Sequence, residues 1–428
     1  MKIIYIAPGT GGTFYCQNCM RDVSLVRAMR RYHHEVTLVP VYLPIMIDAR
    51  DVARDVPVFF GGINVYLQQK FPFFRKTPRW LDRLFDAPHL LRLAAQREGS
   101  TEAAGLGPMT LSVLRGEDGN QKKELDRLLD WLEAHEKPDL VHLSNSLFAG
   151  LAGEIKRRLR VPVVCSLQDE ENWVDAMAKP YDQLCWDAMA EKKDSIDAFV
   201  AVSEWYGNKM SARMKLDKSR LHIVPLGVEL DARCPAPLPF DPPVIGYLSK
   251  MCKSLGLGLL VDAFIALKKK PELRNLRLRA TGGQHGPDAA FIKELREKLR
   301  REGMDQDVEF REGFNLEERR EFLRSLTVLS VPARCGEAFG LHIIEAMGEG
   351  VPVVQPHAGG YPEVIRGTGG GLLYDPDDPG GLVSSLESLL RNPEHARQLG
   401  AQGREAVGRF YTVDVMAAGI AKVYESLL

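Results

Sequence analysis

Two glutamates stand eight positions apart in "EAFGLHIIEAMGEGVPVV", residues 337–354: Glu337 and Glu345. Glu337 precedes an apolar run that is typical of a helix, and Glu345 falls in the second turn of that helix. Gly340 would let a ligand approach the helix start, where backbone N–H groups and the helix dipole favour anionic or hydroxyl-rich groups. The two acceptor oxygens of a carboxylate suit a vicinal diol such as a ribose. The spacing alone leaves open a ligand site or two solvated glutamates.

Short runs rich in Val, Ile and Leu alternate with helical patterns on both sides of this stretch, as in buried parallel sheets. The first series of predicted strands is 2–7, 35–41, 139–143, 161–167, 197–203 and 221–227. The second series is 244–249, 276–282, 308–313, 326–332, 351–356 and 371–374. This order predicts an α/β protein with two doubly wound Rossmann-like domains, in which ligands bind at the carboxyl ends of the strands.

A stiff linker, "CPAPLPFDPP" (234–243), separates the two series. We therefore expect an N-terminal domain over 1–235 and a C-terminal domain over 243–410. The last segment, 413–428, has apolar residues at helical spacing and needs an apolar partner. Those residues are Val415, Met416, Ile420, Val423 and Tyr424.

Composition excludes several classes of protein. The 428 residues carry 56 Lys and Arg against 57 Asp and Glu, a formal net charge of −1, so nucleic acid is not an expected partner. No apolar run approaches the ~20 residues of a membrane-spanning helix. The seven cysteines are odd in number and scattered, which favours a reducing cytoplasm over a disulfide framework.

The chain resembles the retaining glycosyltransferases of family 4, which have the GT-B fold. The resemblance rests on the two glutamates with "GVPVV", followed by "GGYPEVI" (359–365), and on further motifs along nearly the whole chain. These are "PGTGG" (8–12), "VSEWY" (202–206), "IVPLGVE" (223–229), "GYLSKMCKSLG" (246–256), "ATGG" (280–283) and "FYTVDVMAAGIAKVYESLL" (410–428).

The resemblance implies roles for the matching positions. Glu345 would bind the donor ribose, and Glu337 would bind hydroxyls of the donor sugar near the reacting carbon. The backbone N–H groups that would assist Glu337 belong to Ala338, Phe339 and Gly340. In this family the segment 413–428 crosses back onto the first domain.

Lys253 matches the lysine that neutralises the leaving diphosphate, and Gly11 and Gly12 match the glycine turn that approaches the phosphate and the acceptor. Preorganised cations and N–H groups stabilise the charge that develops on a diphosphate. The family usually has an arginine where Tyr247 stands, and Lys250 or Arg334 could substitute for its charge.

The acceptor side also departs from the family. Ser144 and Asn145 occupy a stretch that often carries a histidine, and Gln168 replaces another frequent histidine. Leu226 stands where asparagine is common. Tyr247 and the missing histidines motivate an alternative, a catalytically silent protein that binds a sugar nucleotide or a partner. A further alternative is a sugar-nucleotide isomerase on the same fold.

Residues 66–85 mix cations with large aromatic residues, which suits a lipid or an extended acceptor. A loop packed on its own domain explains the same composition. Five Phe and Trp residues (Phe71, Phe73, Phe74, Trp80, Phe85) are interspersed with five cations (Lys70, Arg75, Lys76, Arg79, Arg83).

Two motifs suggest other chemistry. Cys16 and Cys19 form a C-x-x-C pattern that fits pocket lining, a redox pair or half a zinc site. "DPDDP" (375–379) offers a D-x-D pattern, but we interpret it as a helix-capping loop. We assign no catalytic role to His342 or His357 and expect no metal.

The sequence thus predicts a cytoplasmic, metal-independent retaining glycosyltransferase with no cofactor. Its expected substrates are a nucleotide diphosphate sugar, UDP being favoured over GDP or ADP, and a hydroxyl acceptor such as a polysaccharide or lipid-linked glycan precursor. Peripheral contact with the inner face of a membrane is expected through 66–85.

Overall fold

The computed structural model describes residues 1–9, 14–42, 56, 59–60, 62–77, 103–231, 237–284, 286 and 288–428. Contacts divide the chain into two compact units. Unit 1 comprises Met1–Gly12, Asn18–Pro225 and Met416–Leu428, and unit 2 comprises Thr13–Gln17 and Leu226–Val415. The division after Pro225 comes before the proline-rich stretch.

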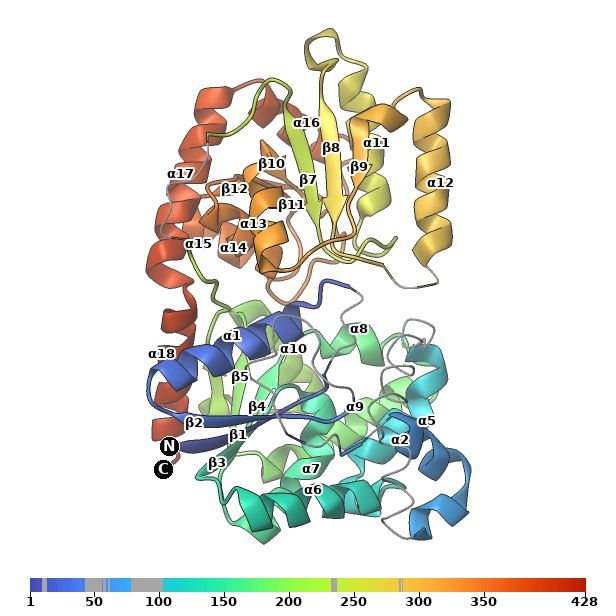
Figure 1. The fold of residues 1–428 in the computed structure, drawn as a ribbon, viewed down its shortest axis with the longest axis vertical. Coiled ribbons are helices and arrows are strands. Elements are labelled where there is room, and N and C mark those ends of the chain that lie inside the picture. The colour runs from blue at the N-terminus through green and yellow to red at the C-terminus, as the bar shows by residue number, and fades with distance from the viewer. Residues whose placement is uncertain are drawn as a thin grey trace. The chain divides into compact units, whose positions relative to one another are not determined.

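Unit 1 is built on a six-stranded parallel sheet in the order β2-β1-β3-β4-β5-β6 (Figure 1). Its strands are β1 (Lys2–Ala7), β2 (Glu35–Pro40), β3 (Leu140–Leu143), β4 (Val163–Leu167), β5 (Ala198–Ala201) and β6 (Leu221–Ile223). The side chains of β3, β4 and β5 are all buried, as expected of strands covered on both faces.

Helices follow these strands along the chain. They are α1 (Gln17–Arg31), α2 (Gly62–Lys70), α5 (Ala103–Leu114), α6 (Lys122–His135), α7 (Ala149–Leu159), α8 (Glu170–Val174), α9 (Tyr181–Lys192), α10 (Glu204–Met214) and α18 (Val413–Glu425). Helix α6 shows why they form, because Leu125, Leu128, Leu129 and Leu132 recur at helical spacing and are all buried.

The final helix, α18, packs within unit 1 from Met416 onward, so both chain ends lie in this unit (Figure 1). Met416, Ile420, Val423 and Tyr424 are at most 4% exposed. Val415, which we expected on the same apolar face, is 44% exposed because one helical residue of offset turns it toward solvent.

A buried polar network joins α18 to the sheet. The His142 ring on β3 lies between the Tyr424 hydroxyl (Nδ1–O 2.6 Å) and the Ser166 hydroxyl on β4 (Nε2–O 2.8 Å). Arg21 donates to Ser166 at 2.6 Å and to Asp22 at 3.1 Å. Burial lowers the pKa of His142, so this imidazole is neutral and acts as a structural hydrogen-bonding group.

Unit 2 holds a second six-stranded parallel sheet in the order β12-β11-β10-β7-β8-β9. Its strands are β7 (Val244–Leu248), β8 (Arg277–Thr281), β9 (Val308–Phe310), β10 (Val328–Leu329), β11 (Val353–Pro356) and β12 (Gly371–Tyr374). The strand order reverses between β7 and β10, and a ligand crevice is expected outside the carboxyl ends of these two strands.

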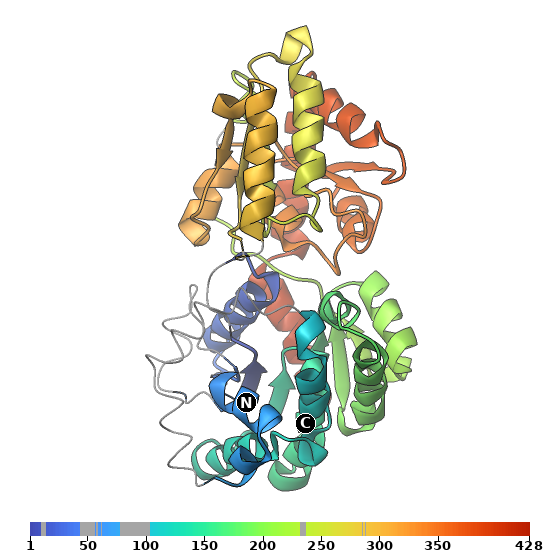
Figure 2. The same ribbon diagram turned by 90° about the vertical axis from the view of Figure 1, so that its right-hand side faces the viewer.

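The helices of unit 2 are α11 (Leu257–Lys268), α12 (Asp288–Arg301), α13 (Leu316–Arg324), α14 (Leu341–Gly348), α15 (Tyr361–Thr368), α16 (Gly381–Leu390) and α17 (Pro393–Phe410). Helices α11 and α12 lie side by side over one face of the sheet (Figure 2). The predicted α/β class with two doubly wound sheets is confirmed, although β6 and β10 are shorter than predicted.

Candidate active site

The loop that follows β10 and the start of α14 form the centre of the candidate site in unit 2. Gly340 is the N-cap of α14 and has φ +92°, a left-handed conformation that favours glycine. A Cβ at this position would lie 2.7 Å from Cε1 of Tyr361. Glycine is therefore required both by the backbone and by the space in front of the helix.

Glu337, just before this helix, is 7% exposed and accepts two hydrogen bonds. The Tyr361 hydroxyl donates to Oε2 at 2.7 Å, and the Gln17 amide donates to Oε1 at 2.6 Å. His342 Nδ1 lies 3.4 Å from Oε2. Burial raises the pKa of Glu337 to about 7, against the opposing effect of the hydrogen bonds from Tyr361 and Gln17.

His342 does not supply a compensating charge. The ring is fully buried, and burial lowers its pKa to about 3, so it is neutral near pH 7. Its Nε2 lies 3.2 Å from the side-chain amide of Gln355, which places it in the packing beneath the helix. Within the residues that the structure describes, Glu337 therefore accepts hydrogen bonds from uncharged side chains and has no ion pair with a Lys or Arg.

Glu345, in contrast, forms a buried ion pair. Arg319 Nε donates to Oε1 at 3.0 Å, and the Tyr15 hydroxyl donates to Oε2 at 2.7 Å. Arg319 also donates to the carbonyl of Phe314 at 2.9 Å, which fixes the guanidinium on α13. A charge-assisted pair of this kind holds the glutamate in one orientation.

The 14–17 segment, Phe14 to Gln17, lies against these groups within unit 2. In addition to the hydrogen bond from Tyr15 to Glu345, the segment makes a second one. The Oε1 atom of Gln17 accepts from the backbone N–H of Leu341 at 2.6 Å. The Tyr15 backbone N–H donates to the carbonyl of Gly282 at 2.7 Å. Sequence reasoning missed Tyr15, Gln17 and Arg319, because no local pattern links residues so far apart along the chain.

The loop between β7 and α11 carries the predicted cations. Lys253 is exposed there, and Lys250 pairs with Asp288 at 3.2 Å. Tyr247 is fully buried, and its hydroxyl donates to the carbonyl of Lys250 at 2.9 Å. An arginine at position 247 would therefore place its charge in the core, unless the loop moved.

The remaining predicted residues of unit 2 lie around this centre. Arg334, after β10, is exposed and pairs with Asp377 at 3.1 Å. Ala338 and Phe339 are buried beside Gly340. In the predicted capping loop, Asp378 accepts from the backbone N–H of Gly380 at 2.9 Å, immediately before α16.

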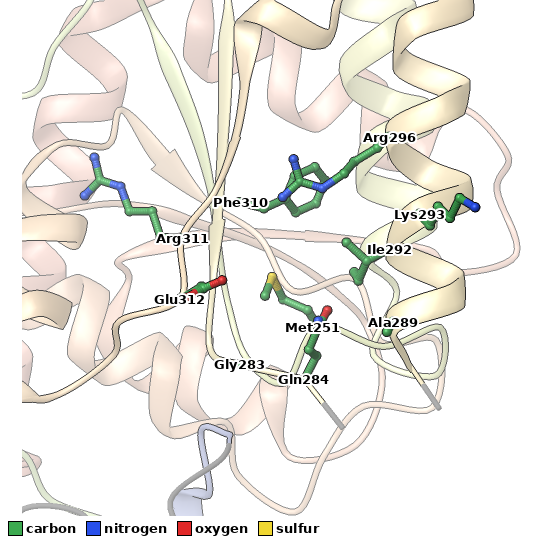
Figure 3. Close-up of a pocket in the computed structure, with 10 residues that line it drawn as sticks. All are labelled: Met251, Gly283, Gln284, Ala289, Ile292, Lys293, Arg296, Phe310, Arg311 and Glu312. Carbon is green, nitrogen blue, oxygen red and sulfur yellow. The ribbon is translucent and has the colours of Figure 1, made fainter. Parts of the chain in front are cut away.

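A cavity of about 410 Å³ opens at the carboxyl ends of β8 and β9, beside α12 (Figure 3). The Arg296 guanidinium carbon lies 4.7 Å from the centre of the Phe310 ring, so a cation and an aromatic face meet on its wall. The lining residues are Met251, Gly283, Gln284, Ala289, Ile292, Lys293, Arg296, Phe310, Arg311 and Glu312. Its size suits a ring system.

The predicted acceptor-side residues lie in unit 1, at the carboxyl ends of β3 and β4. Gln168 Nε2 donates to the carbonyl of Ser144 at 2.7 Å, so the structure brings these two together. Asn145 Oδ1 accepts from the backbone N–H of Leu147 at 3.1 Å and caps a short 3-10 turn. Within the described residues, Gln168 Oε1 is a buried acceptor without a partner.

Some of the sequence predictions fall wholly or partly outside the described residues. Gly11 and Gly12 lie outside them, as does 78–85 of the aromatic and basic stretch. In the described part of that stretch, Phe71 is 53% and Phe73 is 75% exposed. Cys16 and Cys19 are partly exposed at the start of α1.

Two further features are absent from the part of the chain that the structure describes. No three or more His, Cys, Asp and Glu side chains gather as metal ligands would. None of the helices there combines the length and apolar character that a bilayer crossing requires.

Two family models match the chain. Residues 23–227 match "Glycosyl transferase 4-like domain", and residues 242–392 match "Glycosyl transferases group 1". The first match ends before the predicted linker, and the second begins at its last two residues. They confirm the resemblance on which the sequence interpretation rests.

Relatives share parts of the chain. It is 28% identical over 191 residues to a D-inositol 3-phosphate glycosyltransferase of Corynebacterium kroppenstedtii, covering 45% of this chain and 42% of that one. It is 28% identical over 234 residues to the MMP alpha-(1->4)-mannosyltransferase of Mycolicibacterium hassiacum, covering 54% of this chain and 55% of that one. Identity to the lipopolysaccharide core biosynthesis mannosyltransferase LpsB of Rhizobium meliloti is 30% over 190 residues, covering 43% and 52%. The chain thus spans about half the length of these relatives.

Solved structures extend the likeness to the whole chain. Anabaena Alr3699/HepE, in complex with UDP and glucose, superposes with a TM-score of 0.70 at 15% identity and full coverage of both chains. Sucrose-phosphate synthase from Thermosynechococcus elongatus gives 0.68 at 18% identity, covering 99% of this chain and 98% of that one. At these identities the likeness shows a shared fold.

Proposed function

The chain belongs to the family 4 glycosyltransferases, which have the GT-B fold, and on that premise we propose that it transfers a sugar from a nucleotide diphosphate sugar to a hydroxyl acceptor. The observation that carries the proposal is the pair Glu337 and Glu345 around the N-terminus of α14. Hydrogen-bond partners hold both carboxylates in place, and Gly340 places no side chain in front of the helix start between them.

The parts of unit 2 supply the groups that such a donor requires. Glu345 would accept the ribose hydroxyls, and the cavity beside Phe310 would take the nucleobase. The backbone N–H groups at the start of α14 would face the phosphates and sugar oxygens. Glu337, oriented by Tyr361, would accept hydroxyls of the transferred sugar.

The proposed reaction retains configuration at the transferred carbon. The acceptor oxygen forms a bond to the anomeric carbon while the bond from that carbon to the diphosphate oxygen breaks on the same face. The acceptor proton passes to the departing phosphate, so no protein base and no metal is required. Lys253 would stabilise the charge that develops on the diphosphate.

The identity of the donor is the finer part of the proposal. We favour UDP-sugar, since the HepE structure similar to this chain holds UDP. A thermal-shift series with UDP, GDP and ADP tests this, because a ligand that binds only the folded state raises the unfolding temperature. A larger shift with GDP or ADP would reverse the base assignment, and no shift with any of the three would contradict the nucleotide site.

Turnover then tests the activity. We expect release of nucleoside diphosphate from one donor of a panel and an acceptor product with the anomeric configuration of the donor, measured by proton NMR. The relatives named above are one D-inositol 3-phosphate glycosyltransferase and two mannosyltransferases, so glycan and polyol acceptors are the first to try. An inverted product would contradict the retaining mechanism.

The exposed Phe71 and Phe73 beside Lys70 support a peripheral contact with an anionic membrane on the cytoplasmic side. We expect the protein to sediment with vesicles containing phosphatidylglycerol and a Phe71→Ser/Phe73→Ser variant to remain in the supernatant. Equal sedimentation of both proteins would leave the stretch as a loop of unit 1.

A further inference from the structure

The 14–17 segment makes the contacts that a sugar nucleotide would make. The Tyr15 hydroxyl donates to Glu345 at 2.7 Å, as a ribose hydroxyl would. The Gln17 amide nitrogen donates to Glu337 at 2.6 Å, as a sugar hydroxyl would. The Gln17 amide oxygen accepts from Leu341 N–H at 2.6 Å, as a phosphate or sugar oxygen would.

These contacts compete with a ligand for the same groups. The Leu341 N–H has one proton and makes one strong hydrogen bond. Glu345 has Oε1 engaged by Arg319 and Oε2 engaged by Tyr15. Tyr15 is only 3% exposed, so its ring fills space in front of Glu345 as well as satisfying the carboxylate.

Further contacts hold the segment along the loops of unit 2. Phe14 forms an isolated antiparallel β-bridge with Gly283, and the Tyr15 N–H donates to the Gly282 carbonyl at 2.7 Å. The Arg319 guanidinium carbon lies 5.9 Å from the centre of the Tyr15 ring, within reach of a cation–π contact. The segment is therefore bound at both its backbone and its polar side chains.

We propose that the 14–17 segment is an internal competitor of the sugar nucleotide, which occupies the donor site of the resting protein and must leave before the donor binds. The proposal rests on the donor site assigned above. The measured dissociation constant is then the intrinsic constant divided by the fraction of molecules whose segment has left. A substitution that weakens the contacts between the 14–17 segment and the donor site should therefore tighten nucleotide binding.

Tyr15→Phe tests this most directly, since it removes the hydroxyl and keeps the ring. The ligand is whichever of UDP, GDP and ADP binds most tightly by calorimetry. We expect its dissociation constant to fall about three- to tenfold, because that gain is available when the 14–17 segment occupies the site in most molecules. Gln17→Met should act in the same direction. Tyr32→Phe, at an exposed tyrosine, is the matched control and should change nothing.

An unchanged or weaker affinity in Tyr15→Phe overturns the proposal, and a weaker one would make Tyr15 a donor-binding residue instead. Glu345→Ala distinguishes a failure of the donor-site assignment from a failure of the proposed competition. If it weakens nucleotide binding while Tyr15→Phe leaves the affinity unchanged, the donor site stands and the competition fails. If none of the three nucleotides binds wild type or Tyr15→Phe, both fail.

Hydrogen exchange of the wild-type protein gives a second measurement that needs no variant. Saturating nucleotide should speed exchange of the Tyr15 amide, because release of the segment breaks its bond to Gly282. Slower exchange would mean that the segment closes over the nucleotide, which overturns the proposal.

Discussion

At the scale of single residues, the two glutamates differ in their electrostatic surroundings. Glu345 is paired with Arg319, whereas Glu337 receives hydrogen bonds from the uncharged side chains of Tyr361 and Gln17. Burial raises the pKa of the Glu337 carboxyl, and the hydrogen bonds from Tyr361 and Gln17 oppose that effect only in part. Substitutions at the two positions should therefore have different consequences.

Glu345→Ala should weaken nucleoside diphosphate binding by about 1.5–3 kcal/mol, the range for hydrogen bonds to a charged group. Isothermal titration calorimetry measures the loss, and circular dichroism checks folding, since the variant leaves Arg319 without this partner. Glu394→Ala, at an exposed glutamate of α17, is the control. Because Glu345→Ala also removes the partner of the Tyr15 hydroxyl, the comparison is made in the Tyr15→Phe background, where an affinity equal to that of Tyr15→Phe alone would place the nucleotide elsewhere.

The raised pKa of Glu337 predicts a pH dependence of stability. With a folded-state pKa of about 7 against an ordinary 4.5, the folded protein holds a proton that the unfolded protein releases. The stabilising contribution of this group is present below about pH 4.5 and is lost as pH rises through 7. Glu337→Gln should remove this part, so the unfolding temperature of the variant relative to wild type should increase from pH 5 to pH 8. A constant difference would contradict the assignment.

Lys253→Ala should lower kcat about 10²–10³-fold if the lysine stabilises the leaving diphosphate, as losses of one electrostatic stabiliser often do. Lys269→Ala, at a surface lysine paired with Glu302, is the matched control and should keep the wild-type rate. The rates are compared at saturating donor, so that binding does not contribute. A wild-type kcat in Lys253→Ala would remove it from the mechanism.

At the scale of secondary structure, the start of α14 depends on one glycine. Gly340→Ala should cost about 1–3 kcal/mol of stability from the backbone conformation alone. The added Cβ would also press on Tyr361, which orients Glu337, so nucleotide-dependent turnover should fall as well. Gly303 is the control, because it also has a positive φ, +70°, and an added Cβ would meet nothing within 4 Å. Gly303→Ala should therefore lose stability without losing turnover.

At the scale of the whole molecule, α18 completes unit 1 although it lies at the opposite end of the sequence. Deleting 413–428 should uncover the apolar surface beneath Met416, Ile420 and Val423 and cause aggregation, measured by light scattering. Tyr424→Phe is the milder test and should lower stability by about 1 kcal/mol through loss of the bond to His142. Tyr32→Phe serves as its control, and a soluble, fully active truncation would contradict the prediction.

The sequence by itself determined the fold class. Each buried strand corresponds to a short run of apolar residues, and each helix to apolar residues that recur at helical spacing. It also determined that α14 carries a glutamate at each side of its start, since "EAFGLHIIE" is continuous in the chain. Strand ends were less well predicted: only Val328 and Leu329 of the run 326–332 pair as β10, because pairing depends on neighbouring strands.

The tertiary structure decided which side chains surround the two glutamates. Arg319 and Tyr15 bond Glu345 from positions 26 and 330 residues away, and no local pattern encodes such distances. It also decided that Tyr247 points into the core, because whether a strand residue faces the core or a loop depends on how the sheet is covered. Local propensity thus set the elements of this protein, and long-range packing set the environment in which their carboxylates work.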